Sequence, residues 1–183
     1  MRLVRTAITL AEAKAFVAVH HRHHPRSPCG HLFSLGLTDG AALRGVAIVG
    51  RPSNKTLDAN LWAEVTRLCV APGSLRGACS QLYAAAARQL SAWNHRRPAE
   101  QQRLVLCTYT LASESGASLR GAGWVPVELP ADSSARRGRR APGAHKQKGK
   151  MEKCPLGPKQ FWVYPLVDMP GLYPGVPQAD LLR

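Results

Sequence analysis

The sequence predicts a single α/β (α+β) domain in which a central sheet is flanked by helices. Three observations support this class: a helix start signal at Thr9, a hairpin signal after it, and an alanine-rich stretch at 78–93. A chain of 183 residues usually buries one core. We therefore expect one domain over residues 1–167 and a tail rich in proline and glycine at 168–183.

Local patterns predict the individual elements. Thr9 and Glu12 can form a capping box at the start of the first helix. Asp39 and Gly40, between two β-rich runs, are typical of a hairpin turn. The alanine content of the stretch near the middle of the chain favours a helix. In chain order, we expect strands at 2–8, 32–38, 42–49, 61–70, 104–111, 124–129 and 161–166, and helices at 10–19, 78–93 and 113–121.

A basic segment lies before the last predicted strand. The protein has a formal net charge of +14. Residues 131–153 contain eight Lys or Arg and two Asp or Glu, which is a net charge of +6 in 23 residues. We expect a basic loop at 131–158, which is either solvated or meets phosphate groups. The charge indicates a polyanionic partner, with DNA as the first candidate.

The five cysteines are an odd number, widely spaced, with no Cys-x-x-Cys pair. This pattern is typical of a reduced intracellular protein. The sequence shows no signal-peptide pattern and no apolar run of about 18 residues that could cross a membrane. We therefore expect a cytoplasmic protein with no membrane partner, and the sequence leaves its oligomeric state open.

Five of the seven histidines fall within twelve positions, from His20 to His31. We expect residues 20–24 to form the last turn of the first helix, which Pro25 ends. His20 and His24 would then share one helical face, as many metal-binding pairs do. No acidic third ligand lies at motif spacing. We therefore favour contact with a base or phosphate, or capping of the helix end, over metal binding.

A strand followed by a glycine-containing helix start lies at residues 64–80. Arg76, Gly77 and Ala78 open the predicted helix, where backbone N–H groups and the positive helix end favour a pyrophosphate. This block resembles the cofactor loop of the GNAT (general N-acetyltransferase) superfamily. The resemblance implies a mixed, splayed central sheet and a site for acetyl-CoA or another acyl or glycyl donor. The implied cofactor contacts in this block are Leu68, Cys69, Val70, Arg76, Gly77, Ala78, Cys79 and Ser80.

A second block, residues 113–124, resembles the end of the GNAT fold, where a helix runs into the sixth strand. Ser113 and Ser115 could hydrogen-bond the cofactor, or they could cap the helix. Many GNAT enzymes place a tyrosine four residues before a Gly-Phe pair in this block to protonate the leaving thiolate. Leu119 occupies that position here.

A narrower resemblance covers several stretches, including the histidine cluster and residues 108–124. Together they resemble phage and prophage proteins related to Mom, the DNA adenine-modifying protein of phage Mu. The resemblance implies transfer of a small acyl or carbamoylmethyl-like group to adenine N6 in DNA, which protects the DNA from restriction. The base would have to leave the duplex and stack on an aromatic wall. Trp62, Phe33 and Tyr109 are candidates for that wall.

In that arrangement Glu64, on the fourth strand, would be the general base, because a partly apolar cleft can raise the pKa of a glutamate toward neutrality. The alternative is a surface carboxylate paired with Arg67 or Arg44. Tyr109 would donate to the developing oxyanion or leaving group, or it is a buried aromatic. His24 is a third catalytic candidate.

The expected DNA contacts combine the histidine cluster with nearby and distant arginines. They are His20, His21, Arg22, His23, His31, Arg51, Arg136, Arg137, Arg139 and Arg140. We therefore expect a phage-type DNA modification transferase. Two alternatives stay open: an acyl-CoA-dependent N-acetyltransferase acting on a small molecule, protein or aminoacyl-tRNA, and a non-catalytic nucleic-acid-binding protein on the same scaffold.

Overall fold

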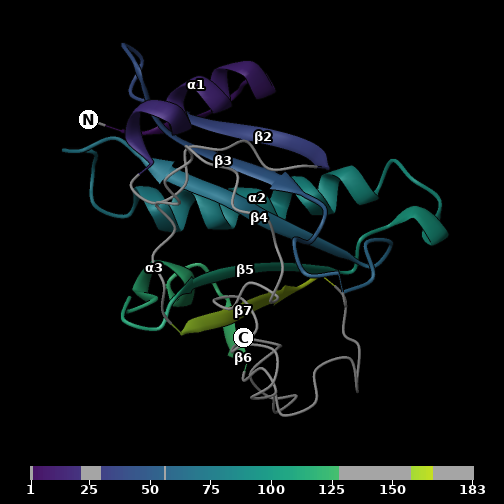
Figure 1. Cartoon of the computed structure of the whole chain (residues 1–183). Coiled ribbons are helices and arrows are strands. Elements are labelled where there is room, and N and C mark those ends of the chain that lie inside the picture. The colour runs from purple at the N-terminus through teal and green to yellow at the C-terminus, as the bar shows by residue number, and fades with distance from the viewer. Residues whose placement is uncertain (1, 22–29, 56, 128–157, 167–183) are drawn as a thin grey trace, which may run out of the picture.

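A computed structural model shows a seven-stranded sheet with helices on both faces (Figure 1). The strand order is β1-β2-β3-β4-β5-β7-β6. The predicted tail at 168–183, and all but the last residue of the predicted basic loop, lie outside the described residues. The structure describes residues 2–21, 30–55, 57–127 and 158–166.

The predicted order of strands and helices is confirmed, and a short 3-10 helix, η1, is added to it. The third predicted helix is much shorter than expected, because residues 113–115 are not helical and Gly116 has a positive φ of 65°. The elements are β1 (Val4–Ala7), α1 (Leu10–His20), β2 (His31–Thr38), β3 (Leu43–Gly50), β4 (Trp62–Val70), α2 (Ala78–Asn94), η1 (Ala99–Gln101), β5 (Val105–Leu111), α3 (Ala117–Arg120), β6 (Val125–Val127) and β7 (Lys159–Pro165).

The first helix starts as predicted and ends early. The Glu12 N–H donates to Thr9 Oγ1 (3.2 Å) and the Thr9 N–H donates to Glu12 Oε2 (2.7 Å), which completes the capping box. The last residue of α1 that is buried against the sheet is Val17. His21 has an extended backbone (φ −78°, ψ 117°). Because helix stability comes mainly from packing, the helix does not continue past its buried face.

This end point corrects one prediction about the histidine cluster. The predicted continuation of the helix past His20 is wrong at His21, which is extended, and residues 22–24 lie outside the described residues. The shared helical face expected for His20 and His24 required one continuous helix through both residues, and α1 ends at His20. His24 itself lies outside the described residues.

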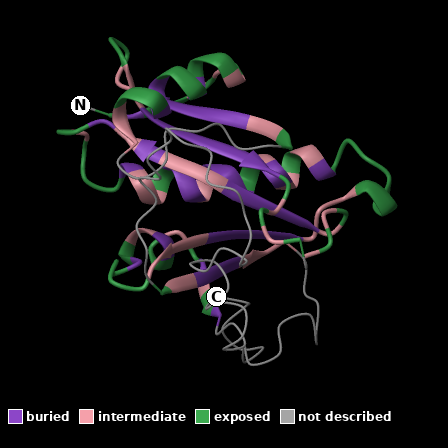
Figure 2. Ribbon diagram, viewed as in Figure 1, coloured by how far each residue is buried: buried purple, intermediate pink, exposed green. Residues whose placement is uncertain are grey.

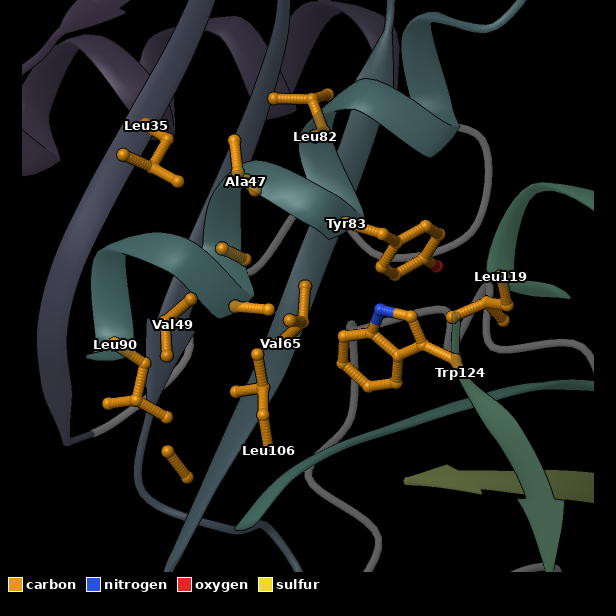
Figure 3. Packing of buried hydrophobic residues seen from close by; sticks show 14 of the residues in the cluster. Leu35, Ala47, Val49, Val65, Leu82, Tyr83, Leu90, Leu106, Leu119 and Trp124 are labelled. Atoms are coloured by element: carbon orange, nitrogen blue, oxygen red, sulfur yellow. The ribbon is translucent and has the colours of Figure 1, made fainter. Parts of the chain in front are cut away.

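Helices cover both faces of the first part of the sheet, and the strands between them are largely buried (Figure 2). On one face, Ala13, Phe16 and Val17 of α1 pack against Val46 and Ile48 of β3. On the other face, α2 lies over the sheet and buries the larger core, which contains residues of both ends of the sheet (Figure 3). These two clusters identify, for β3 and β4, which residues face α1 and which face α2.

The sheet is mixed and splayed, as the GNAT resemblance implied. β4 and β5 are parallel and pair at three positions only, Trp62 to Glu64 with Val105 to Cys107. The other neighbouring strands are antiparallel. Beyond Glu64 the two strands separate, and Figure 1 shows β5 leaving β4.

No helix in the described part of the chain is both long enough and apolar enough to cross a membrane.

Candidate functional site

A β-bulge in β4 brings two charged side chains to the same face of the sheet. Val49 of β3 pairs with Val65, whereas the preceding Ile48 pairs with Arg67, so Thr66 is an extra residue. The Thr66 hydroxyl donates to the Ile48 carbonyl (3.0 Å). Residues three apart in a regular strand point to opposite faces, but the bulge places Glu64 and Arg67 together.

A second bulge, in β2, has the same effect. His31 pairs with Gly50 and Phe33 pairs with Val49, so one residue, Leu32, is extra on β2. His31 and Ser34 therefore share a face, and His31 Nε2 lies 2.9 Å from Ser34 Oγ. Partial burial lowers the pKa of His31, and the nearby charge of Lys14 lowers it further.

The two bulges align polar side chains across three strands. On the face that α1 covers, Glu64 and His31 are separated by β3, so their backbones are about 10 Å apart at the usual strand spacing. Two rows of paired residues cross from β2 through β3 to β4. The first row is Ser34, Ile48 and Arg67, and the second row is His31, Gly50 and Glu64.

Glu64 is a buried carboxylate held in a fixed orientation. Its exposed fraction is 6%. Glu64 Oε2 accepts a hydrogen bond from the Ser53 N–H (2.6 Å), and Oε1 accepts one from the Ser53 hydroxyl (3.1 Å). Arg44, one of the partners that the surface alternative required, pairs instead with Asp39. Glu64 is therefore not a surface residue, and Arg44 is not its partner.

Tyr109 lies on the same face as Glu64. Glu64 pairs with Cys107, and Tyr109 is two residues further along β5. The Tyr109 ring is half-buried and packs on Phe161 (4.8 Å between ring centroids). Trp62 is on this face as well. Phe33 is not, because it pairs with Val49 and packs in the core under α2, so the expected three-residue aromatic wall is wrong for Phe33.

The loop before α2 is open, as the cofactor prediction requires. Gly77 is the N-cap residue, with a φ of 86°, and no side chain caps the helix. Gly73 also has a positive φ, 74°. A Cβ built on either glycine would meet no described heavy atom within 4 Å. Arg76 is exposed beside them.

The other predicted cofactor contacts divide between the two faces. Leu68 and Val70 pack on the core under α2, whereas Cys69 is buried in the α1 cluster. The Cys69 side chain therefore points away from those of its neighbours. Cys79 and Ser80 are half-buried in the first turn of α2, and Ala78 is buried.

Ser113 and Ser115 are exposed in the turn between β5 and α3. The Ser115 hydroxyl accepts a hydrogen bond from the Ala117 N–H (3.4 Å), but the N-cap residue of α3 is Gly116 and no side chain caps it, so the capping alternative is wrong. The turn is held by Glu114, which accepts a bond from the Leu111 N–H (3.1 Å).

Part of the predicted DNA surface lies at the end of β2 and β3. The Arg51 N–H donates to the Gly30 carbonyl (2.8 Å), which places Arg51 beside His31. The His20 ring packs on Phe16 (4.5 Å), at the end of α1. In the described ranges, no three His, Cys, Asp or Glu residues form a group that could hold a metal ion. Predicted residues outside the described ranges are Arg22, His23, His24, Arg136, Arg137, Arg139 and Arg140.

Four residues near the site were not found by sequence reasoning: Ser34, Ser53, Tyr83 and Thr108. Ser34 and His31 are three apart in a predicted strand, which indicates opposite faces unless a bulge is known. Ser53 lies in a loop with no motif. Tyr83 and Thr108 were within a predicted helix and strand, and helical periodicity alone gives Tyr83 a core position.

The sequence matches no protein-family model and no curated protein. The ribosomal-protein-S18-alanine N-acetyltransferase of Escherichia coli has a similar structure, with a TM-score of 0.55 and 14% identity over 94% of this chain and 99% of that one. A putative acetyltransferase from Salmonella typhimurium, solved with acetyl-CoA, has a TM-score of 0.56 and 11% identity, and the match covers 92% of this chain and 96% of that one. A GNAT family acetyltransferase from Elizabethkingia anophelis, with acetyl-CoA bound, has a TM-score of 0.55 and 11% identity, and the match covers 90% of this chain and 98% of that one. This chain therefore has the fold of GNAT acetyltransferases.

Proposed function

We propose that the protein is an acyl-CoA-dependent N-acyltransferase. The observation that supports this most is the separation of β4 from β5 directly after the buried, oriented carboxylate of Glu64. An open helix start lies at the far end of the same strand, since β4 runs from Glu64 to the loop that precedes α2. One strand thus connects a possible general base with a possible phosphate site.

The loop before α2 suits the pyrophosphate of CoA. Gly73 and Gly77 leave the backbone accessible, Arg76 adds a positive charge, and the N-terminus of a 17-residue helix attracts anions. The edges that β4 and β5 turn toward each other beyond Glu64 can hydrogen-bond an extended pantetheine arm. Two of the similar structures contain acetyl-CoA, which supports the same donor here.

The acceptor amine would meet the thioester on the α1 face, next to Glu64. Glu64 takes the proton that the amine loses as it attacks the carbonyl carbon, and Ser53 holds the carboxylate in place. Tyr109, on the same face, contacts the acceptor or the oxyanion. A positioned general base accounts for about 10²- to 10⁴-fold in rate.

Two measurements test this function. Calorimetry with acetyl-CoA should show saturable binding that Arg76→Ala weakens. Release of CoA thiol should then follow addition of an amine, tested with a peptide that has a free N-terminal alanine, with a polyamine and with duplex DNA. Absence of acetyl-CoA binding by the wild-type protein contradicts the proposal.

DNA adenine is a second candidate acceptor, supported by the formal net charge of +14 and by the position of Arg51 and His31 near the site. In this version the donor could be an acyl or glycyl group. Mass spectrometry of nucleosides from the DNA of expressing cells should reveal an altered adenosine. If only unmodified nucleosides are found, DNA is not the substrate. If a biological effect on DNA survives Glu64→Gln, non-catalytic binding is favoured.

A further inference from the structure

We propose that three arginines at one end of the sheet bind the phosphate backbone of a nucleic acid. They are Arg51, Arg97 and Arg103, and together with the ring of Trp93 they form what we call the arginine cluster. The binding surface does not depend on the proposed acyl transfer. Its role, to hold a nucleic acid that carries the acceptor amine, rests on the proposed function.

The arginine cluster lies where β3 ends, α2 ends, and β4 and β5 begin (Figure 1). Trp93 is in the last turn of α2 and packs on the core under that helix. Arg97 follows α2, Arg103 comes shortly before β5, and Arg51 follows β3 directly. Two parts of the chain that are far apart in the sequence therefore meet in the cluster.

The Trp93 ring fixes the positions of two guanidinium groups. The guanidinium carbon of Arg97 lies 3.8 Å from the ring centroid, and that of Arg103 lies 5.9 Å from it. A guanidinium over an aromatic ring uses its flat face, so the N–H groups at its edge can still bind another ligand. Such edges match phosphate oxygens with two parallel hydrogen bonds. Because the ring orients these groups in advance, less entropy is lost when a phosphate binds.

Arg103 is held in place by the surrounding backbone. Its N–H donates to Asn94 Oδ1 (2.9 Å), and Asn94 Nδ2 donates to the Arg103 carbonyl (2.6 Å). In the side chain, Arg103 Nη1 donates to the Asn60 carbonyl (2.7 Å). The guanidinium is therefore fixed where the end of α2 meets the loop before β4.

The positive charge of the arginine cluster is not balanced by nearby carboxylates. Burial lowers the pKa of Arg103, and the charges of Arg51 and Arg97 lower it further. Asp58 acts in the opposite direction, but none of the three arginines forms an ion pair with a described residue. Cations gathered around one ring repel one another. A bound anion would relieve this repulsion, so the arrangement favours an anionic ligand.

A chain of phosphates fits the arginine cluster better than a small anion does. Each strand of a nucleic acid duplex carries one negative charge about every 3.4 Å along the helix axis, so neighbouring phosphates can meet neighbouring guanidiniums. The formal net charge of +14 also attracts a long polyanion more strongly than a single charge. A nucleic acid is therefore the class of partner that we assign to this surface.

The arginine cluster borders the part of β4 that carries Glu64. Arg51 directly follows Gly50, which pairs with Glu64. Ser53, in the same loop, donates two hydrogen bonds to the Glu64 carboxylate. A nucleic acid bound to the cluster thus lies next to the proposed general base, and it can carry the acceptor amine. The proposed CoA site, at the other end of β4, is not covered.

Fluorescence anisotropy without acetyl-CoA tests the surface, with a short labelled DNA strand, its duplex and the matching RNA strand as probes. Arg97→Gln should weaken binding about tenfold at low salt and should lower the slope of log affinity against log salt by about one. Trp93→Leu should weaken binding about threefold, although it removes no charge, because the guanidiniums lose their support. Acetyl-CoA binding, measured by calorimetry, should be unchanged in both variants.

Arg5→Gln is the matched control, because it removes the same charge from an exposed arginine. Arg5 pairs with Leu37 near the β2–β3 turn, at the other end of the sheet from the arginine cluster. It should leave affinity close to the wild-type value. Equal losses in Arg97→Gln and Arg5→Gln would show that only net charge matters, and would overturn the surface. Polyglutamate that binds as tightly as the nucleic acids, and loses as much in Arg97→Gln, would assign the surface to an acidic protein and overturn the proposal.

Transfer from acetyl-CoA to an oligonucleotide with a terminal primary amine tests the role. Arg97→Gln should raise the KM for this acceptor about tenfold with an unchanged kcat, and transfer to hydroxylamine should stay at the wild-type rate. An unchanged KM for the oligonucleotide would overturn the role. Wild-type protein that binds acetyl-CoA but none of the nucleic acids overturns the surface alone. Wild-type protein that binds nucleic acid but no acetyl-CoA overturns the proposed function, and with it the role in acyl transfer, while the surface stands.

Discussion

The two parts of the sheet on either side of the β4–β5 junction are built differently. β1 to β4 form a continuous antiparallel unit with a helix on each face. β5, β7 and β6 form a second antiparallel unit, which joins the first through three paired positions. The proposed chemistry lies at this junction. Beyond the three paired positions, the facing backbone edges of β4 and β5 do not pair with each other.

The junction is held mainly by packing. The core under α2 contains Leu106 and Trp162 from the second unit together with Leu35 and Val49 from the first. The divergence of β4 and β5 is therefore stabilised by a shared core on the α2 side. The functional groups can therefore be tested separately from the packing that holds the units together.

The largest effect is expected for the carboxylate at the junction. Glu64→Gln should lower the rate of acyl transfer by about 100-fold or more, because the amide cannot act as a base. Acetyl-CoA binding, measured by calorimetry, should change little. Glu12→Gln is the matched control, since Glu12 lies in the capping box of α1, away from the junction. Wild-type turnover in Glu64→Gln would show that another group is the base.

One added methyl group at Gly116 should strongly destabilise the second unit. A Cβ on Gly116 would lie 2.2 Å from Trp162 Cζ2, and Gly116 has a φ of 65°. Gly116→Ala should reduce the free energy of unfolding by about 3 kcal/mol or more, through backbone strain and overpacking together. Gly123→Ala adds strain at a φ of 80° with a nearest contact of 3.6 Å, so a loss of about 1 kcal/mol is expected. Urea denaturation measures both, and equal losses would contradict the contact with Trp162.

A smaller effect is expected where the first unit holds Glu64. Ser53→Ala removes the hydroxyl that donates to Oε1 and keeps the backbone donor to Oε2. We expect turnover to fall by about tenfold, since one hydrogen bond to a charged group contributes about 1.5 kcal/mol. Ser91→Ala, in the distant half of α2, should have no effect on turnover. A wild-type rate in Ser53→Ala would mean that the backbone N–H orients Glu64 alone.

The smallest effect concerns the β2–β3 turn, far from the junction. The Arg44 guanidinium and the Ala42 N–H lower the pKa of Asp39 to about 2. A lowered pKa stabilises the fold above the ordinary aspartate value, and this contribution is lost as the pH falls toward 2. The Asp39 carboxyl should therefore titrate near 2 by NMR, and in Arg44→Gln closer to its ordinary value. An unchanged midpoint in Arg44→Gln would contradict the pairing.

The fold could be predicted further than the site. Alternation, the capping box and the Asp39 turn are local signals, and the structure confirms the elements that they predict. The order of strands in the sheet is not a local property, and the GNAT resemblance implied only that the sheet is mixed and splayed. Glu64 was found because its motif precedes the cofactor loop.

The bulges explain most of what the sequence could not show. One extra residue in β4 and one in β2 reverse which side chains share a face, and no residue pattern marks Thr66 or Leu32 as extra. Ser53 contacts Glu64 from a loop that carries no motif, so its role in holding the carboxylate could not be predicted. The end of α1 was predicted too late because the sequence pattern does not show that the buried face of the helix ends at Val17, one turn before His21.

Amide chemical shifts on addition of acetyl-CoA test the account most directly. The shifts should concentrate in two segments that meet only at the junction: residues 65–80, from the bulge of β4 to the start of α2, and residues 108–111 of β5. Such a pattern would confirm that the donor lies between the two units of the sheet. No shift, or shifts confined to the outer strands β1 and β6, would contradict the claim that the β4–β5 divergence is the functional site.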